Sequence, residues 1–387
     1  MNYGRLKANY GRILRYTTGA FISTTPTHYS TTINKTLRKN EVVKSINHHA
    51  ISAIYANSLA SNHPMEDRHV VHTCTTTGAA MFTVIDGHGG WRCGQHVKQQ
   101  ISSYVMSHLD DVSIKVKLEE NFDKLEDVDF TATPPLASNS VDDIKRQLQQ
   151  SFISLDDDIS QAALADVKQV GIGRSLESQQ HILTAFSGAC VNTALLYGQH
   201  LYVANTGDCR CVLGQLEDGK WRAVPLSIDQ AFENDDEVAR VKKAHPGEEY
   251  TVIVHKRLLG GLMPLRSFGD VIYKWSKQYL NIIYQQVPPN YLTPPYLTAE
   301  PVVTHRKLDK QDKFVVIATD GLWECLSSDE VIDIVSKGLS SSDNIATNLL
   351  KQSLGSDDET VYRLLTVDPQ YSRWYRDDIT IVVVVFK

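Results

Sequence analysis

Three aspartates in this chain stand at the borders of apolar segments. They are Asp86 after residues 81–85, Asp320 after residues 314–318, and Asp377 before residues 379–386. Each of them alone is more often a turn or cap residue. Strand ends can converge in one folded unit, however, and carboxylates on rigid strand ends are the hard oxygen ligands that Mg²⁺ and Mn²⁺ require. The shared context therefore indicates a divalent metal site.

The segment that begins at Asp86 reads Asp-Gly-His-Gly-Gly and places a histidine among glycines. Because glycine lets the backbone come close to a ligand, the Gly87 carbonyl is a candidate for a further metal contact. His88 has three interpretations at this point: a metal ligand, a general acid, or an ordinary turn histidine. Its position alone does not separate them.

Two segments must position this loop. Residues 70–85 hold two apolar runs around a turn of threonines and a glycine, which predicts an antiparallel pair of strands that ends at Asp86. Residues 91–109 carry apolar side chains four apart, which predicts a helix directly after the loop.

The other apolar segments are short and separated by turns. Residues 188–225 alternate apolar runs with three short turns, which predicts antiparallel strands. Residues 234–237 and 327–330 carry the capping signals of helix starts. Antiparallel strands interleaved with helices indicate an α+β fold in which an antiparallel β-sandwich is flanked by α-helices.

Residues from about 110 to 183 are polar and charged, and two prolines interrupt them at 134 and 135. One credible helix, over residues 141–165, lies within this stretch. We expect most of the stretch to be a polar insertion that leaves the core.

The composition excludes several classes of protein. No apolar run in the 387 residues approaches the length of a membrane span, so no transmembrane segment is expected. A net charge of −6 argues against a nucleic-acid surface. The six cysteines form no Cys-x-x-Cys pair, so neither a zinc site nor a disulfide framework is indicated, and a reducing compartment is expected.

The first forty residues differ from the rest of the chain. They contain seven Lys or Arg, no Asp or Glu, and many Ser and Thr. This composition is typical of a mitochondrial transit peptide, with a disordered basic tail as the alternative. We therefore expect a transit peptide over residues 1–40, one folded domain over residues 41–387, and residence in the mitochondrial matrix.

Six short motifs follow one another along the chain. They are Met65-Glu66-Asp67, Asp86-Gly-His-Gly-Gly90, Asn205-Thr-Gly-Asp208, Arg266-Ser-Phe-Gly-Asp270, Asp320-Gly-Leu-Trp-Glu324 and Arg376-Asp377-Asp378. One motif alone is a weak signal, but six in a fixed order are specific. In this order they resemble the PPM, or type 2C, metal-dependent protein phosphatases. The resemblance implies an α-β-β-α sandwich with metal ions in a cleft at one end.

The resemblance also implies roles for the individual residues. For the two main Mg²⁺ or Mn²⁺ ions the implied ligands are Asp86 as the bridge, Asp320 and Asp377 on one ion, and the Gly87 carbonyl on the other. The remaining implied ligands are Glu66 and Asp67, which act through water, and Asp208, Asp320 and Glu324 at a third, weaker site. A metal-bridged water would attack phosphorus, and His88 would protonate the leaving serine oxygen.

Within the family, the resemblance is strongest to the pyruvate dehydrogenase phosphatases, through residues 66–68, 288–301, 320–324 and 375–380. That subgroup implies phosphoserine on the pyruvate dehydrogenase E1 alpha subunit as the substrate. It implies as partners the lipoyl domain of the E2 core, with Ca²⁺ assisting docking, and a regulatory subunit.

Two positions depart from the common family pattern. Many members carry a phosphate-binding arginine where this chain has Asn62, so the metals or another cation must hold the phosphate. Asp378 stands where asparagine is common and would add charge beside the metals.

Two alternatives to this function stay open: a type 2C phosphatase for another mitochondrial phosphoprotein, and a catalytically inactive scaffold of the same fold. The intact Asp86, Asp320 and Asp377 weigh against the scaffold. No cysteine is followed six residues later by arginine, and no P-loop or His-Glu-x-x-His motif is present, so cysteine phosphatases, P-loop enzymes and zinc proteases lack support.

Overall fold

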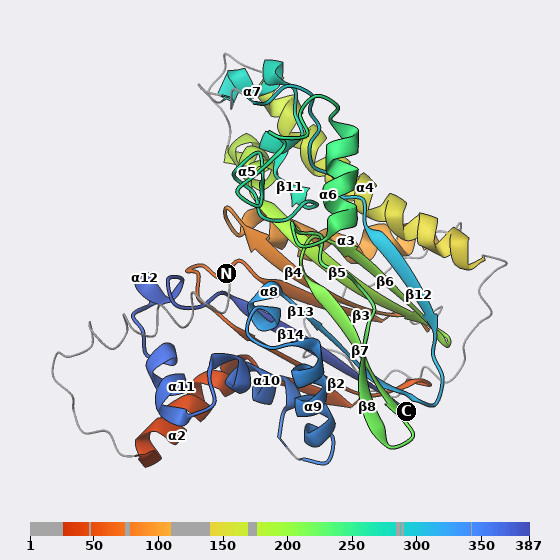
Figure 1. The fold of residues 1–387 in the computed structure, drawn as a ribbon, viewed down its shortest axis with the longest axis vertical. Coiled ribbons are helices and arrows are strands. Elements are labelled where there is room, and N and C mark those ends of the chain that lie inside the picture. Colours follow the sequence, from red (N-terminus) through yellow and green to blue (C-terminus); the bar gives the residue numbers. More distant parts are fainter. Residues whose placement is uncertain are drawn as a thin grey trace.

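The computed structural model describes residues 26–45, 48–73, 78–109, 140–168, 176–283, 287, 290–341 and 343–387. Two antiparallel sheets lie face to face in the middle of the molecule, and helices cover the outer face of each (Figure 1). The α-β-β-α sandwich that the sequence predicts is therefore confirmed.

One sheet has the strand order β12-β6-β5-β4-β3, with a short β11 paired to β5. Its strands are β3 (Arg68–Thr73), β4 (Ala80–His88), β5 (Gly188–Tyr197), β6 (His200–Thr206), β11 (Phe268–Gly269) and β12 (Val302–Lys307). The antiparallel β3–β4 pair confirms the predicted hairpin, and β4 carries Asp86, Gly87 and His88 at its C-terminal end.

The other sheet has the order β1-β2-β14-β13-β7-β8. Its strands are β1 (Val42–Ser45), β2 (Ile51–Leu59), β7 (Arg210–Glu217), β8 (Lys220–Pro225), β13 (Asp312–Ala318) and β14 (Ile379–Phe386). A separate two-stranded ladder joins β9 (Ile253–Val254) and β10 (Arg257–Leu258). Because β13 and β14 are antiparallel neighbours, the end of β13 lies beside the start of β14. This pairing places Asp320 and Asp377 at the same edge.

The layer between the sheets is apolar. It includes Phe82 and Val84 from one sheet and Leu213 and Ile317 from the other, all essentially inaccessible to solvent. Successive side chains of a strand point to opposite faces, so each sheet also presents an apolar outer face that helices must cover.

Helices from distant parts of the sequence cover the two outer faces (Figure 1). The face of the β4 sheet carries α3 (Arg92–Leu109), α4 (Val141–Lys168) and α5 (Leu176–Phe186). The face of the β14 sheet carries α2 (Pro26–Leu37), α9 (Ser328–Gly338), α10 (Ile345–Leu354) and α11 (Asp358–Leu365). The remaining helices of the described residues are α6 (Asp235–Ala244), α7 (Lys277–Ile283), α8 (Asp320–Trp323) and α12 (Pro369–Ser372), with 3₁₀ turns at Arg38–Asn40 and Val271–Tyr273.

The predicted helix starts are confirmed. Asn234 caps α6 by accepting a hydrogen bond from the Glu237 N–H, and Ser327 with Glu330 forms a capping box before α9. The helix predicted after the Asp86 loop is α3. No helix in the described part of the chain is long and apolar enough to cross a membrane. The five cysteines that the structure describes take part in no disulfide.

The interpretation of residues 110–183 as a polar insertion off the core is wrong for its helical part. Helix α4 buries ten residues, including Leu148, Phe152 and Leu155, against α3 and the β4 sheet. The average composition of this segment is polar, but its apolar residues lie on one face, so the helix is amphipathic. Residues 110–139 lie outside the described residues.

One of the predicted short turns also proved different. Strands β6 and β7 are joined through residues 207–209, yet they do not pair, because β6 belongs to one sheet and β7 to the other. The connection crosses the sandwich instead of reversing within a sheet. It thereby carries Asp208 to the edge where Asp86 lies.

The domain boundary expected at residue 40 is revised by helix α2. Ile33 and Leu37 are 1% and 2% exposed in the core cluster with α10 and α11. The side chain of Asn57 also donates to the Leu37 carbonyl at 2.8 Å. Residues 26–40 therefore belong to the folded domain, and residues 1–25 lie outside the described residues.

We expect Ile33→Ala to lower the free energy of unfolding by about 2–5 kcal/mol, because it leaves a cavity under α2. Asn34→Ala changes the neighbouring exposed position and is expected to stay within about 0.5 kcal/mol of the parent. Urea unfolding of both variants measures the difference. Equal stability of the two variants would mean that α2 is not part of the cooperative core.

Candidate metal centre and phosphatase site

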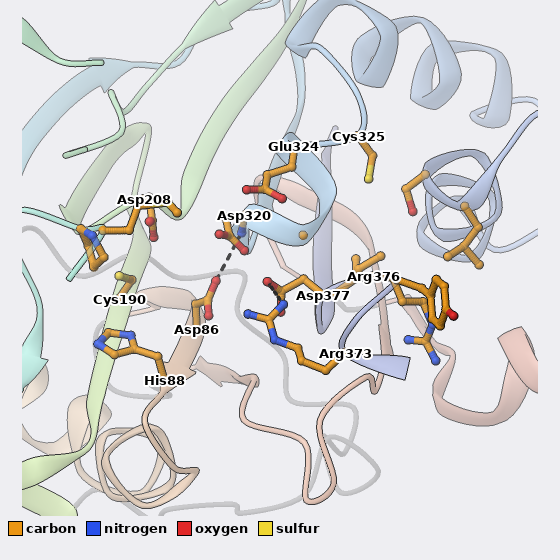
Figure 2. Close-up of a pocket in the computed structure, with 18 of the residues that line it drawn as sticks. Asp86, His88, Cys190, Asp208, Asp320, Glu324, Cys325, Arg373, Arg376 and Asp377 are labelled. Carbon is orange, nitrogen blue, oxygen red and sulfur yellow. Dashed lines mark hydrogen bonds and ion pairs between the residues drawn. The ribbon is translucent and has the colours of Figure 1, made fainter. Parts of the chain in front are cut away.

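Three carboxylates meet at one edge of the sandwich, each delivered by a different element. Asp86 comes from the end of β4, Asp208 from the crossing between the sheets, and Asp320 from the first residue of α8. Their oxygen atoms lie within 4.8 Å of one another. Figure 2 shows the three side chains pointing toward a common space. The convergence that the strand-end pattern predicts for Asp86 and Asp320 is confirmed.

A pocket of about 290 Å³ opens onto this cluster. It is lined by seven of the nine residues predicted for the site, namely Asp86, Gly87, His88, Asp208, Asp320, Glu324 and Asp377. They come from β4, the β6–β7 connection, α8 and the residues before β14. The first and last of these carboxylates in the sequence, Asp86 and Asp377, are 291 positions apart, and the fold brings them to one pocket.

The other two predicted residues, Glu66 and Asp67, do not line the pocket. Asp67 is 3% exposed and accepts a hydrogen bond from the Thr319 hydroxyl at 2.7 Å. The backbone of Glu66 packs on Gly87, where an added Cβ would come within 2.6 Å of the Glu66 carbonyl oxygen. A side chain at position 87 would therefore separate Glu66 from the Asp86 loop.

The electrostatics of the cluster favour bound cations. Burial raises the pKa of Asp86 well above its ordinary value, and the charges of Asp320 and Asp67 raise it further. Burial likewise raises the pKa of Asp320, with Asp377 and Asp208 adding to the effect. Like charges in a buried site cannot all stay ionised unless cations neutralise them. The all-oxygen donor set fits Mg²⁺ or Mn²⁺.

His88 has a partner that sequence reasoning missed. Its Nε2 lies 2.6 Å from Asp270 Oδ2, and the Ser267 hydroxyl donates to the same oxygen at 2.6 Å. Burial lowers the pKa of His88 and is the largest single influence on it, but the charge and hydrogen bond of Asp270, with the charges of Asp208 and Glu66, together make the net shift upward. A Cβ on Gly188 would lie 2.1 Å from His88 Nε2, so only glycine fits beneath this pair.

The loop that carries Asp270 is tied to helix α4. Asp156 of α4 accepts hydrogen bonds from the Gly269 N–H at 2.7 Å and from Lys274 Nζ at 2.6 Å. Asp270 itself has a φ of 50°, in the left-handed region that non-glycine residues rarely adopt. The buried Asp156–Lys274 pair therefore fixes the loop in a conformation that aims Asp270 at His88. In the sequence, the motif Arg266–Asp270 was the signal that could have pointed to Asp270, but the motif does not show that Asp270 contacts His88.

Asp378, which is expected to add charge beside the metals, also has a structural role. Its carboxylate accepts hydrogen bonds from the backbone N–H groups of Ser61, Asn62 and Glu66 at 2.5, 2.8 and 2.7 Å. The side chain of Asn62 also donates to it, at 3.2 Å. The two unusual positions thus contact each other. Asp378 holds the loop before β3 in place, and the side chain of Asn62 is used in this contact. Burial is the largest cause of the raised pKa of Asp67, and the charge of Asp378 raises that pKa further.

Comparison with known proteins agrees with this geometry. The protein phosphatase 2C family matches residues 58–359. Mitochondrial pyruvate dehydrogenase (acetyl-transferring) phosphatase 2 of Homo sapiens is 35% identical over 92% of this chain and 82% of its own length. The corresponding phosphatase 1 of Bos taurus is 33% identical over 96% and 86%.

Among solved structures, a serine-threonine phosphatase 2C from Toxoplasma gondii superposes with a TM-score of 0.56 at 17% identity, over 90% of this chain and 99% of its own. This likeness supports the fold alone, whereas the family match and the relatives cover most of the sequence. The chain belongs to the protein phosphatase 2C family and is a metal-dependent protein serine/threonine phosphatase.

Proposed function

We propose that this phosphatase removes phosphate from phosphoserine on the pyruvate dehydrogenase E1 alpha subunit and so reactivates that complex in the mitochondrial matrix. The observation that carries the chemistry is the cluster of half-buried carboxylates around one pocket, together with the His88–Asp270 pair. Relatives over 30% identical along most of the chain are named as mitochondrial pyruvate dehydrogenase phosphatases, which supports the substrate and the location. A transit segment would then be confined to residues 1–25.

Metal ions of the Mg²⁺ or Mn²⁺ type would be held by three groups of residues. The proposed assignment is Asp86, Asp320, Asp377 and the Gly87 carbonyl for two ions, Glu66 and Asp67 through water, and Asp208 and Glu324 with Asp320 for a third. When bound, such ions supply an activated water and neutralise phosphoryl charge. The convergence of Asp86, Asp208 and Asp320 within 4.8 Å supports the assignment.

His88 would act on the leaving group. Since Nε2 is engaged by Asp270, Nδ1 is the nitrogen that would donate a proton to the serine oxygen. Asp270 favours the protonated imidazole, because its charge and hydrogen bond raise the histidine pKa against the effect of burial. General-acid catalysis of this kind contributes about 10²–10⁴ in rate.

The proposal extends to partners that the pyruvate dehydrogenase subgroup implies. A lipoyl domain of the E2 core would dock this phosphatase near its substrate, with Ca²⁺ assisting, and a regulatory subunit would be a further partner. The 33–35% identity to the named phosphatases supports membership of that subgroup, from which these partners are inferred.

The substrate is tested with metal-stripped protein. We expect activity on phosphorylated pyruvate dehydrogenase to return on addition of Mg²⁺ or Mn²⁺, with kcat/KM at least about tenfold above that on an unrelated phosphoprotein, a preference of roughly 1.4 kcal/mol. Release of inorganic phosphate measures both reactions. Equal rates would favour another phosphoprotein as the substrate, and no release with either metal would favour the inactive scaffold.

A further inference from the structure

The substrate of this pocket is an anion, yet five of the side chains that line it are carboxylates. A phosphoserine carries about −1.5 to −2 charges at neutral pH. Among the described residues, three arginines line the pocket: Arg257, Arg373 and Arg376. Which of them faces the phosphate depends on what else each of them holds.

Two of the three arginines have structural roles. Arg376 donates through Nη1 to the Ala60 carbonyl at 2.6 Å and to the Ser61 hydroxyl at 2.5 Å, which fastens the start of β14 to the end of β2. Arg257 donates to the Gly261 carbonyl at 3.0 Å and stays with the β9–β10 ladder.

Arg373 is placed differently. Its Nη1 forms an ion pair with Asp377, its side chain is 47% exposed, and it lines the pocket. Figure 2 shows the guanidinium pointing toward Asp377, with Asp86 across from it. A guanidinium has five N–H donors in a planar fork, so contact with one carboxylate oxygen leaves donors for a second anion.

The backbone that carries Arg373 is held firmly. Arg373 directly follows helix α12, and Ser372 before it is 1% exposed and donates to the Ser61 carbonyl at 2.6 Å. The Arg376 contacts fix the chain on the other side. A cation on a fixed backbone binds a tetrahedral anion with little loss of chain entropy.

We propose that Arg373 binds the phosphoryl group of the substrate, donating to its oxygens from beside Asp377. This inference rests on the proposed phosphatase function and names the residue that holds the phosphate. It also accounts for Asn62, since the cation comes from the segment after α12 and not from the loop before β3.

Inorganic phosphate is the probe that tests the proposal. We expect Arg373→Met to weaken phosphate binding to the Mg²⁺-loaded protein by about 10- to 100-fold in calorimetric titration, as loss of a charge-assisted hydrogen bond does. KM for a phosphoserine peptide should rise by a similar factor. Arg373→Lys keeps the charge but not the fork and should show a smaller loss.

Arg222→Met is the matched control, because Arg222 is also a partly exposed arginine paired with a carboxylate, Glu217, but lies on β8 outside the pocket. It should bind phosphate as the wild type does. Suppose that the wild-type protein is active and that Arg373→Met binds phosphate with unchanged affinity, while its Mg²⁺ concentration for half-maximal activity shifts. Arg373 would then only position Asp377, and the inference would be overturned. Failure of wild-type turnover with either metal would instead overturn the proposed function.

Discussion

Asp320→Asn is expected to reduce Mg²⁺-dependent turnover by roughly 10³-fold or more. A carboxylate oxygen of Asp320 lies within 4.8 Å of oxygens of both Asp86 and Asp208, and the proposed assignment uses Asp320 for more than one ion. Metal ions contribute several kcal/mol of charge stabilisation in the transition state, and 1.36 kcal/mol corresponds to one decade in rate. Phosphate release from a phosphoserine peptide at saturating Mg²⁺ measures the loss.

Loss of activity must be separated from loss of the fold, and the electrostatics of the site provide the means. The pKa of Asp320 is raised in the folded state by burial and by Asp377, so the folded protein binds more protons than the unfolded chain between the two pKa values. Stability of the metal-free protein should therefore rise as pH falls from 7 toward the unfolded value near 4, and fall as pH rises. Asparagine removes this repulsion, so Asp320→Asn should unfold at a higher temperature than wild type without metal.

The same variant should gain little stability when Mg²⁺ is added, whereas wild type should gain much, because an ion that binds only the folded state stabilises it. Asp333→Asn is the control: Asp333 is a surface residue of α9 paired with Lys337. It should retain wild-type activity and the wild-type response to Mg²⁺. A lower unfolding temperature for metal-free Asp320→Asn would show that Asp320 supports the fold and not a cation.

The parts of the site that could be predicted from the sequence are those that strand ends determine locally. Asp320 and Asp377 border apolar runs, and adjacent antiparallel pairing of those runs as β13 and β14 is sufficient to bring the two carboxylates to one edge. The same holds for Asp86 at the end of β4. Side-chain alternation and the short connections then require helices outside both sheets.

Contacts made across long distances in the sequence could not be predicted in this way. The His88–Asp270 pair joins residues 182 positions apart, and nothing in the loop around Asp270 identifies its partner. A helix at α4 was predicted, but its place in the core was not, because its average composition is polar although one face is buried. The Asp378–Asn62 contact also depends on how the loop before β3 folds back on β14, which no local pattern specifies.

His88→Gln is expected to slow hydrolysis of a phosphoserine peptide by about 10²–10⁴, the range of general-acid catalysis. Loss on p-nitrophenyl phosphate should be much smaller, because nitrophenolate leaves without a proton. His181→Gln is the matched control, since His181 also pairs with an aspartate, Asp166 at 2.9 Å, but lies on α5 and does not line the pocket. It should leave both rates unchanged. Equal losses for His88→Gln on the two substrates would contradict protonation of the leaving group.

The pH dependence gives a second view of the same proton. His88 must be protonated to act as an acid, so the wild-type rate on phosphoserine should decline as pH rises through its folded-state pKa. Burial lowers that pKa, but Asp270, with the charges of Asp208 and Glu66, raises it overall. Asp270→Asn removes the charge that raises this pKa, leaving burial to lower it. The descending limb should then move to lower pH for phosphoserine, while p-nitrophenyl phosphate should not show the shift. An unmoved limb would mean that another group titrates, and that Asp270 positions His88 without setting its charge.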